Sequence, residues 1–345
     1  MVGSVFLANV RSYARLELAL EPGLVLAVGP NGAGKTNLLE SLHVGTQGFS
    51  PRTRSDAELI RFGEQAARIQ LEGTRRGGPI QIGVTLSTGE GKHAEVNGAR
   101  LRAAEQLRSE TSTLVFTPDR LAIVKGGPAA RRAYFDRVLA RLFPSRSTLS
   151  ANYAAVVAQR NAALKRGDRE AIAPWTAQAA ELGAPLVEAR LEVLSLLEPP
   201  VAERAGELGL EAVRLVYEGE PPTLAALEAR LDRDLERGAT GLGPHLDDVS
   251  IAAGGRDLRA FGSQGEQRTT VLALLLAEAA LLAERREEPP LLLLDDVLSE
   301  LDPERRRVLV EQVQGHGQTL ITATTADALP GEPAQLLRVS PGQVQ

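Results

Sequence analysis

The segment 29-GPNGAGKT-36 has the residue types and spacing of a phosphate-binding loop. It fits G-x-x-x-x-G-K-[ST] at every position, with an apolar stretch before it and a helical pattern over about residues 35–46 after it. Glycines let backbone amides curl around phosphate oxygens, and the following helix adds a favourable dipole. Lys35 would reach the β- and γ-phosphates of a nucleotide, and the Thr36 hydroxyl would bind Mg²⁺. A glycine turn that binds nothing is the alternative, and the complete context disfavours it.

A second segment, 290-PLLLLDDVLSELDPERRR-307, places two acids at the end of an apolar run. The run predicts a central parallel strand, buried on both faces, whose carboxyl edge lies where a phosphate-loop nucleotide would sit. Asp295 suits the Mg²⁺ shell, because a cation already bound to phosphates needs only one or two carboxylates. Asp296 is placed one step on, to orient or deprotonate an attacking water. For Asp302, an ordinary helix N-cap ahead of Pro303 stays open as the explanation.

The stretch 261-FGSQGEQRTT-270 puts small polar residues in front of a leucine- and alanine-rich helical pattern over 266–286. Ser263 followed by Glu266 has the spacing of a capping box, which satisfies free amides at a helix start. A helix start is also a ready anion site. The loop precedes the acids by one helix and one strand, and the phosphate loop lies far upstream of both. That spacing disfavours a compact phosphate-loop kinase.

The elements that must position these residues indicate a mixed α/β protein. Residues 3–28 alternate apolar and polar before 24-LVLAVG-29, as a hairpin leading to a buried strand would. Three segments between glycine-rich turns predict antiparallel strands, and further strands and a helix are expected in the same domain. The antiparallel strands are 66–73, 79–87 and 93–98; the others are strands 114–118, 290–296 and 318–324, with a helix from about 303.

From about residue 147 the chain becomes rich in Ala, Leu, Glu and Arg at helical spacing. Helices are expected over 147–165 and 169–198, the second ended by 199-PP-200. A strand near 211–217 and a helix near 223–237 would return the chain to the main domain. The predicted domains are therefore 1–146 with 241–345, and an inserted, mainly helical lobe over 147–240.

Composition excludes several classes of protein. The 345 residues are 43% hydrophobic and 24% charged, and no segment approaches 18 uninterrupted apolar residues, so we expect a globular protein without a membrane span and a cytoplasmic address. The absence of cysteine excludes disulfides, cysteine zinc sites and a cysteine nucleophile. A net charge of −5 does not by itself indicate a nucleic-acid-binding protein. Affinity for phosphates depends on local basic patches, however, and in this sequence the basic residues are mostly arginines.

The order of these motifs resembles that of ABC-type ATPase heads, and more narrowly that of the RecF family of DNA-repair ATPases. Five segments in order resemble the RecF pattern, and mainly the 147–240 insertion is left without a matching motif. They are 9-NVRSYARLEL-18, 29-GPNGAGKTNLLESL-42, 117-TPDRLAIVKGGPAARRAYFD-136, 243-GPHLDDVSI-251 and 293-LLDDVLSELDPERR-306. The resemblance implies an ABC-type head, with a phosphate-loop parallel or mixed sheet, an antiparallel β subdomain and an inserted α-helical lobe.

The resemblance also implies roles for single residues. ATP would be bound by Arg11, Gly29, Pro30, Asn31, Gly32, Ala33, Gly34, Lys35, Thr36 and Asn37, and Mg²⁺ by Thr36 and Asp295, with Asp296 and Lys35 catalytic. In a head-to-tail homodimer, Ser263, Gln264, Gly265 and Glu266 would form a signature that caps the γ-phosphate held by the other copy, and Ser299 and Asp302 would form a loop across the interface. Lys125, Arg131 and Arg132 are candidate DNA contacts.

Some positions depart from the family pattern. Leu246 stands where the family commonly has arginine. The switch histidine of transporter ATPases has no counterpart in 320–329, where Thr324 or Thr325 takes its neighbourhood. The glutamine-loop residue is not obvious near 115–120. Asp296 occupies the position of the usual catalytic glutamate, and a shorter acid is compatible with slow hydrolysis.

The function implied is an ATP-switched DNA-binding protein. ATP would join two heads, the dimer would clamp duplex DNA at gaps or single-strand/double-strand junctions, and slow, DNA-stimulated hydrolysis would release it. The resemblance implies work with RecO and RecR that helps RecA load. The alternatives are the ATPase subunit of a membrane transporter, an SMC- or Rad50-like DNA tether, and a nucleotide-dependent assembly module whose turnover is incidental. The missing switch histidine argues against the first, and the lack of a long coiled coil or a cysteine hook against the second.

Overall fold

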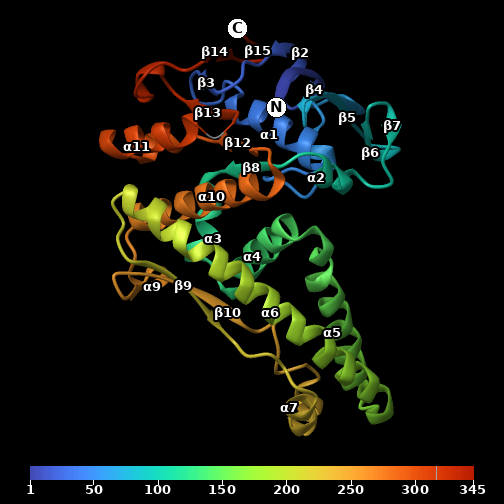
Figure 1. Ribbon diagram of the computed structural model, residues 1–345. Helices are drawn as coiled ribbons and strands as arrows, with labels where there is room; N and C mark the ends of the chain where they lie inside the picture. The colour runs from blue at the N-terminus through green and yellow to red at the C-terminus, as the bar shows by residue number, and fades with distance from the viewer. Residues whose placement is uncertain (316) are drawn as a thin grey trace. The chain divides into compact units, whose positions relative to one another are not determined.

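The computed structural model describes residues 1–315 and 317–345, with Glu300 described by its backbone alone. The chain divides into two compact units, one of Met1–Arg120 with Ala279–Gln345 and the other of Leu121–Glu278. The second boundary falls inside one helix, α10 (Gln264–Arg286). Figure 1 gives the position of each element along the chain.

The first unit contains a six-stranded sheet in the order β15-β14-β3-β13-β12-β8. Strands β14, β3, β13, β12 and β8 are parallel, and the short β15 pairs antiparallel with β14. Every residue of β3, β8, β12 and β13 is buried, as expected for parallel strands covered on both faces. The bounds are β3 Leu24–Val28, β8 Thr113–Phe116, β12 Leu291–Leu294, β13 Thr319–Ala323, β14 Gln335–Ser340 and β15 Gln343–Val344.

A second six-stranded sheet of this unit is antiparallel, in the order β2-β1-β4-β5-β6-β7. Helix α1 (Lys35–Gln47) is buried over most of its length, and its apolar residues share one core with residues of both sheets. The strand bounds are β1 Val2–Val10, β2 Tyr13–Ala19, β4 Ala66–Arg75, β5 Gly78–Ser87, β6 Gly91–Val96 and β7 Ala99–Arg100. The unit also contains α2 (Leu107–Glu110) and α11 (Pro303–Gln314). The hairpin, the antiparallel strands and the buried parallel strands predicted from the sequence are confirmed.

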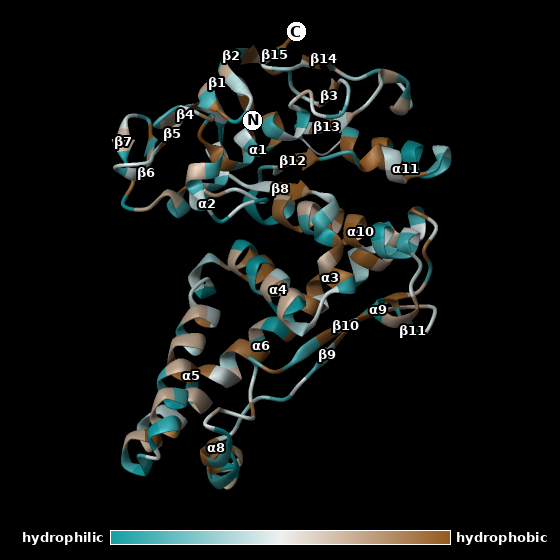
Figure 2. Ribbon diagram, turned by 180° about the vertical axis from the view of Figure 1, so that it is seen from behind, coloured by the Kyte–Doolittle hydropathy of each residue, from teal (hydrophilic) through white to brown (hydrophobic). Residues whose placement is uncertain are grey.

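The second unit is built on helices and a small sheet. Its strands β9 (Val213–Glu218), β10 (Asp248–Ala253) and β11 (Arg256–Asp257) lie in the order β11-β10-β9. Its helices are α3 Ala122–Lys125, α4 Pro128–Leu142, α5 Leu149–Arg166, α6 Arg169–Glu207, α7 Leu224–Ala229, α8 Leu231–Arg237, α9 Leu258–Phe261 and the first part of α10. The apolar residues of α10 are brown in Figure 2.

Two details of the predicted helices are wrong. Helix α6 does not end at Pro199 and Pro200 but runs through both to Glu207. Pro199 and Pro200 are two of the four prolines inside this helix, and each internal proline costs about 3 kcal/mol. The buried side chains of Leu197, Val201 and Ala205, spaced four apart on one face, offset the cost of these two. The helix expected over 223–237 is two helices, divided at Arg230.

The boundaries of the units also differ from the predicted domain limits. The segment 147–240 lies wholly inside the second unit, which is wider at both ends. The physical reason is that β9, inside the segment, pairs with β10, outside it, and that α6 packs on α4. The segment therefore shares a sheet with its flanks, and its folding as a separate lobe stays a prediction.

Candidate nucleotide site

The phosphate loop connects β3 to α1 and is held by a buried tyrosine. Gly34 adopts a left-handed conformation (φ 111°) that strongly favours glycine, and a Cβ there would lie 3.0 Å from the Ser12 and Tyr13 oxygens. The Tyr13 hydroxyl donates to the Gly34 carbonyl oxygen at 3.0 Å. Burial raises the pKa of Tyr13 to about 12, so this donor keeps its proton at neutral pH. Tyr13 thus holds the peptide at which the loop joins α1.

Lys35 is folded back into the same loop. Its Nζ donates to the carbonyl oxygens of Gly29 at 2.7 Å and Pro30 at 3.0 Å, and its side chain is buried. An ammonium has three N–H donors, so it can bind a phosphate oxygen while keeping loop contacts. The role of Lys35 toward a phosphate stays a prediction.

The two acids after β12 meet α1 at the carboxyl edge of the parallel sheet. The Thr36 hydroxyl lies 3.1 and 3.0 Å from the two carboxylate oxygens of Asp295. Thr322, on β13, donates from its hydroxyl to Asp295 Oδ1 at 2.7 Å and accepts from the Asp296 amide at 2.9 Å. Asp295 is buried, whereas Asp296 is partly exposed. The structure brings together the residues predicted to hold a cation and to act on a water.

The donor set at this edge fits Mg²⁺. A carboxylate and a hydroxyl in contact are hard oxygen ligands, and Mg²⁺ bound to phosphates keeps several waters and needs few protein ligands. Among the described residues there is no group of three or more His, Cys, Asp or Glu that could hold a metal ion by itself. Thr36 and Asp295 therefore suit a metal that arrives with a nucleotide.

A buried carboxylate organises the side of the loop that faces the N-terminal strands. Glu40, on α1 and 1% exposed, accepts from Arg11 Nε and Nη2 at 3.0 and 3.1 Å, from Arg52 Nη1 at 3.1 Å and from Ser50 Oγ at 2.5 Å. Asn37, one turn earlier, donates to Ser12 Oγ at 3.0 Å. Arg11 and Asn37, both predicted to bind ATP, are thereby held beside the phosphate loop.

An open hollow of about 610 Å³ lies on this side of the site. Its wall includes Arg11, Ser12, Asn37, Arg52, Arg61 and Phe62. The loop that carries Phe62 is fixed to the N-terminal turn, because the Arg61 amide donates to Asn9 O at 2.8 Å and Arg61 Nη1 to Ser12 O at 2.6 Å. Phe62 is fully exposed all the same. A hollow with arginine, amide and aromatic groups beside a phosphate loop can accommodate a ribose and a base.

Sequence reasoning missed three residues of this site. Glu40 was matched only as part of a motif, and Phe62 and Thr322 were not singled out. A signal existed for Thr322, a polar residue inside the strand expected over 318–324. Phe62 follows no periodic pattern, so the sequence offered no comparable signal for it.

The predicted signature loop forms the start of α10. The Ser263 amide donates to Glu266 Oε2 at 2.7 Å, and the Glu266 amide donates to Ser263 Oγ at 3.2 Å, so the predicted capping box is confirmed. The hydrogen bond donated by the Ser263 amide lowers the pKa of Glu266, and the nearby charge of Arg256 lowers it further. Ser263 and Gln264 are exposed, and Gly265 is partly exposed. Their action on a second copy stays a prediction.

The predicted interface loop lies after the acids. Ser299 Oγ donates to the Asp296 carbonyl oxygen at 2.9 Å, and Asp302 Oδ1 accepts from the Arg305 amide at 2.9 Å ahead of Pro303. Asp302 is therefore the N-cap of α11. Both side chains are exposed, which leaves their role in a dimer open as a prediction.

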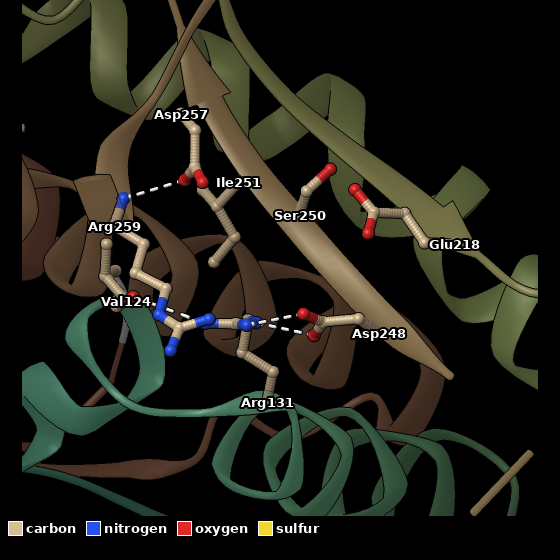
Figure 3. Close-up of a pocket in the computed structure, with 8 residues that line it drawn as sticks. All are labelled: Val124, Arg131, Glu218, Asp248, Ser250, Ile251, Asp257 and Arg259. Atoms are coloured by element: carbon tan, nitrogen blue, oxygen red, sulfur yellow. Dashed lines mark hydrogen bonds and ion pairs between the residues drawn. The ribbon is translucent and has the colours of Figure 1, made fainter. Parts of the chain in front are cut away.

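The predicted DNA contacts in the second unit differ in availability. Arg131 is 3% exposed and makes a bidentate ion pair with Asp248, with Nε–Oδ1 at 2.7 Å and Nη2–Oδ2 at 2.6 Å. Figure 3 shows this pair at the edge of a small pocket. Burial alone would raise the pKa of Asp248, but the bonds from Arg131 and the Val249 amide and the nearby arginine charges hold it below its ordinary value.

This geometry corrects the expectation for Arg131. Arg131 joins α4 to β10, and four of the five N–H donors of its guanidinium are engaged, two with Asp248 and two from Nη1 with the carbonyl oxygens of Val124 and Gly126. A buried group bonded in this way is a poor contact for a phosphate. Arg132 is partly buried and donates from Nη1 to the Asp247 carbonyl oxygen at 2.5 Å. Lys125 is exposed, and DNA contacts by Lys125 and Arg132 stay predictions.

The segment 243-GPHLDD-248 builds the same region. His245 Nε2 lies 3.1 Å from the Thr240 carbonyl oxygen, and Nδ1 lies 3.0 Å from the Tyr153 hydroxyl, so Nε2 carries the proton and Nδ1 accepts. Burial lowers the pKa of His245, against the effect of the bond to Thr240. Leu246, which replaces the family's usual arginine, is 53% exposed. His245 of this motif therefore makes hydrogen bonds inside the second unit, whereas the Leu246 side chain is exposed.

The whole chain has relatives of known family. Residues 1–343 match the family described as RecF/RecN/SMC N terminal domain. The chain is 36% identical, over 99% of its length, to the DNA replication and repair protein RecF of Heliobacterium modesticaldum, of which 98% is covered. This chain belongs to the RecF family. The membership expected from its motifs is confirmed.

Other RecF proteins agree. The RecF protein of a Synechococcus species is 37% identical over 97% of the chain and 95% of its own length. A solved structure of the recombination mediator RecF with ATP, from the RecFOR pathway, matches with a TM-score of 0.89 and 27% identity over 100% of this chain and 96% of that one. The Smc head of Pyrococcus furiosus shares the fold alone, at 15% identity and a TM-score of 0.62. The predicted fold, an ABC-type ATPase head, is thereby confirmed. No described helix is long and apolar enough to cross a membrane.

Proposed function

We propose that this RecF-family chain is an ATP-dependent recombination mediator that binds DNA. The observation that carries the proposal is the contact of Thr36 with Asp295 beside a complete phosphate loop. The loop amides and Lys35 would hold the phosphates, and the hollow lined by Arg11, Asn37 and Phe62 would accept the ribose and base. The family's RecF–ATP structure supports ATP as the nucleotide.

Hydrolysis would be slow and would depend on Asp296. Thr36 and Asp295 would hold Mg²⁺, which neutralises phosphate charge when bound. Asp296, partly exposed at the end of β12, would orient a water and accept its proton. Its side chain is shorter than glutamate, which agrees with a switch of long lifetime and a weak, DNA-stimulated ATPase.

Two copies would join head to tail around ATP. Ser263, Gln264, Gly265 and Glu266 of one copy would cap the γ-phosphate held by the other, since a helix start favours anions and the capping box uses only the amides of Ser263 and Glu266. Ser299 and Asp302 would add contacts across the same interface. The dimer would clamp duplex DNA at gaps or junctions through phosphate contacts without sequence specificity, Lys125 among them. Working on the chromosome, it would act in the cytoplasm.

By family, the partners would be RecR and RecO, and the outcome would be RecA loading. A nucleotide-dependent assembly module is the second candidate, because Asp296 departs from the usual glutamate. That module would bind partners and release them normally in an Asp296→Asn variant, whereas the proposed switch would retain them.

The test is ATP-dependent dimerisation. Sedimentation of the wild-type chain should show a larger species with ATP and Mg²⁺ and a smaller one without nucleotide. Lys35→Ala should remove that difference, because the ammonium that holds the phosphates is lost. A nucleotide-independent dimer in both proteins would contradict the proposal.

A further inference from the structure

One buried hydroxyl connects the two acids of the nucleotide site. Thr322 lies on β13, its side chain is inaccessible to solvent, and β13 pairs directly with β12, the strand that ends at the acids. Its Oγ1 lies 2.7 Å from Asp295 Oδ1 and 2.9 Å from the Asp296 amide nitrogen. No other residue named above touches both acids through a side chain.

The chemistry of the groups fixes the direction of both bonds. A backbone amide only donates, so the hydroxyl accepts from Asp296. Its one proton is then free for Asp295, whose ionised carboxylate only accepts. Thr322 therefore has its proton and a lone pair engaged at once, and Asp295 Oδ1 accepts from Thr322 while Thr36 lies beside both carboxylate oxygens.

The backbone at Asp296 shows why the second bond matters. Its φ is 50°, in the left-handed region that non-glycine residues seldom adopt, although aspartate tolerates it better than most. Its amide is held by Thr322, while the Asp295 amide bonds to the Phe116 carbonyl oxygen at 2.9 Å. The peptides on both sides of Asp295 are thus each held by a hydrogen bond, and the bond from Thr322 fixes the peptide from which the Asp296 side chain leaves the backbone.

We propose that Thr322 is a positioning residue that sets both acids at once. Through Asp295 it fixes the carboxylate that would hold Mg²⁺ against Thr36, and through the Asp296 amide it fixes the acid that would orient the water. The inference rests on the proposed function. It predicts that loss of this single hydroxyl weakens metal-assisted nucleotide binding and turnover together.

The experiment compares three variants of the full-length chain with the wild type. Thr322→Val removes the hydroxyl at nearly constant volume, and Thr322→Ser keeps it. Thr319→Val is the matched control, because Thr319 lies on the same strand, is equally buried, and its Oγ1 has no hydrogen-bond partner in the part of the chain that the structure describes. Two quantities are measured. Calorimetry gives the ATP affinity at increasing MgCl₂, and from it the MgCl₂ concentration at which half of the gain in affinity is reached. The second quantity is kcat for ATP hydrolysis at saturating Mg²⁺.

Thr322→Val should raise the half-saturating MgCl₂ by about tenfold, equivalent to about 1.4 kcal/mol, and lower kcat even at saturating Mg²⁺. ATP binding without Mg²⁺ should change little, because the phosphate loop is intact. Thr322→Ser and Thr319→Val should stay within about twofold of the wild type. Thermal denaturation checks that Thr322→Val is folded. If it is not, Thr322→Cys replaces it, and because a thiol is a weaker donor this variant should show a smaller rise in the half-saturating MgCl₂ concentration.

Two results would overturn the inference. One is a folded Thr322→Val or Thr322→Cys variant whose MgCl₂ requirement and kcat equal those of the wild type. The other is a Thr322→Ser variant as impaired as Thr322→Val, which would show a packing role. A wild-type chain whose ATP affinity gains nothing from Mg²⁺ would instead overturn the proposed nucleotide site itself, and the inference with it.

Discussion

The buried carboxylate of Glu40 makes the sharpest test of how the nucleotide site is held together. Glu40 is 1% exposed and accepts from two arginines and a serine, with oxygen–nitrogen distances of 3.0 to 3.1 Å to Arg11 and 3.1 Å to Arg52. Glu40→Gln keeps the shape of the side chain, removes its charge and turns an N–H group toward donors. Two guanidinium groups then lose their common anion.

The size of the effect follows from burial. Removing one partner of a fully buried ion pair costs about 3–5 kcal/mol. Here the arginines are 22% and 39% exposed and recover part of their hydration, so we expect a loss of about 2 kcal/mol, near the value for a hydrogen bond to a charged group. For a unit of this size that lowers the Tm by about 4–8 °C.

The consequence for function is a weaker nucleotide site. Arg11 and Arg52 line the hollow beside the phosphate loop, and without Glu40 they no longer keep one geometry. ATP affinity should fall by about tenfold, equivalent to about 1.4 kcal/mol. Thermal denaturation measures the first effect, and equilibrium ATP binding to the folded variant measures the second.

The matched control is Glu95→Gln. Glu95 also pairs with an arginine, Arg68 at 3.3 Å, but both side chains are about half exposed (45% and 51%). Such a surface pair contributes about 0–1 kcal/mol, so Tm and ATP affinity should both stay near wild-type values. Equal Tm losses in the two variants, or a normal Tm and ATP affinity in Glu40→Gln, would refute the reasoning.

Three further predictions concern other parts of the chain. Ser263→Arg should leave ATP binding by the monomer intact but block ATP-dependent dimers in sedimentation; lost nucleotide affinity would instead place the residue in its own copy's site. Asp296→Asn should lengthen the life of the ATP dimer, measured by dissociation after ATP is removed, and normal turnover would exclude it as the base. Burial lowers the pKa of His245, so its neutral form contributes stability that is present above the ordinary pKa of 6.5 and is lost as the pH falls through the lower folded value. The Tm of the wild type should therefore fall more steeply below pH 6.5 than that of His245→Gln, and parallel profiles would contradict this.

Local pattern was enough to predict the edge of the sheet that carries the candidate nucleotide site. The apolar run ending at Val28 predicted a buried strand and the run ending at Leu294 a central parallel strand, and their pairing through β13 brings Thr36 to Asp295. The capping box could be predicted because it depends only on two residues three positions apart, Ser263 and Glu266. Features set by short-range spacing were therefore visible in the sequence.

Features set by distant partners were not. Arg131 pairs with Asp248, which lies more than a hundred residues later, and no neighbouring residue indicates this pairing. The basic cluster around Arg131 was therefore predicted to contact DNA. Pro199 and Pro200 predicted a helix end because proline cost is local, whereas the burial that keeps the helix intact comes from tertiary packing. Thr322 becomes meaningful only when β13 lies beside β12.

The most direct test of the central claim is equilibrium DNA binding by the wild-type chain with and without ATP, at one stated salt concentration. Gapped, duplex and single-stranded substrates should be compared by fluorescence anisotropy. An ATP-switched clamp predicts that ATP with Mg²⁺ tightens binding to gapped or duplex DNA by about tenfold or more, and that Lys35→Ala loses this gain. Equal DNA affinity with and without ATP on all three substrates would contradict it.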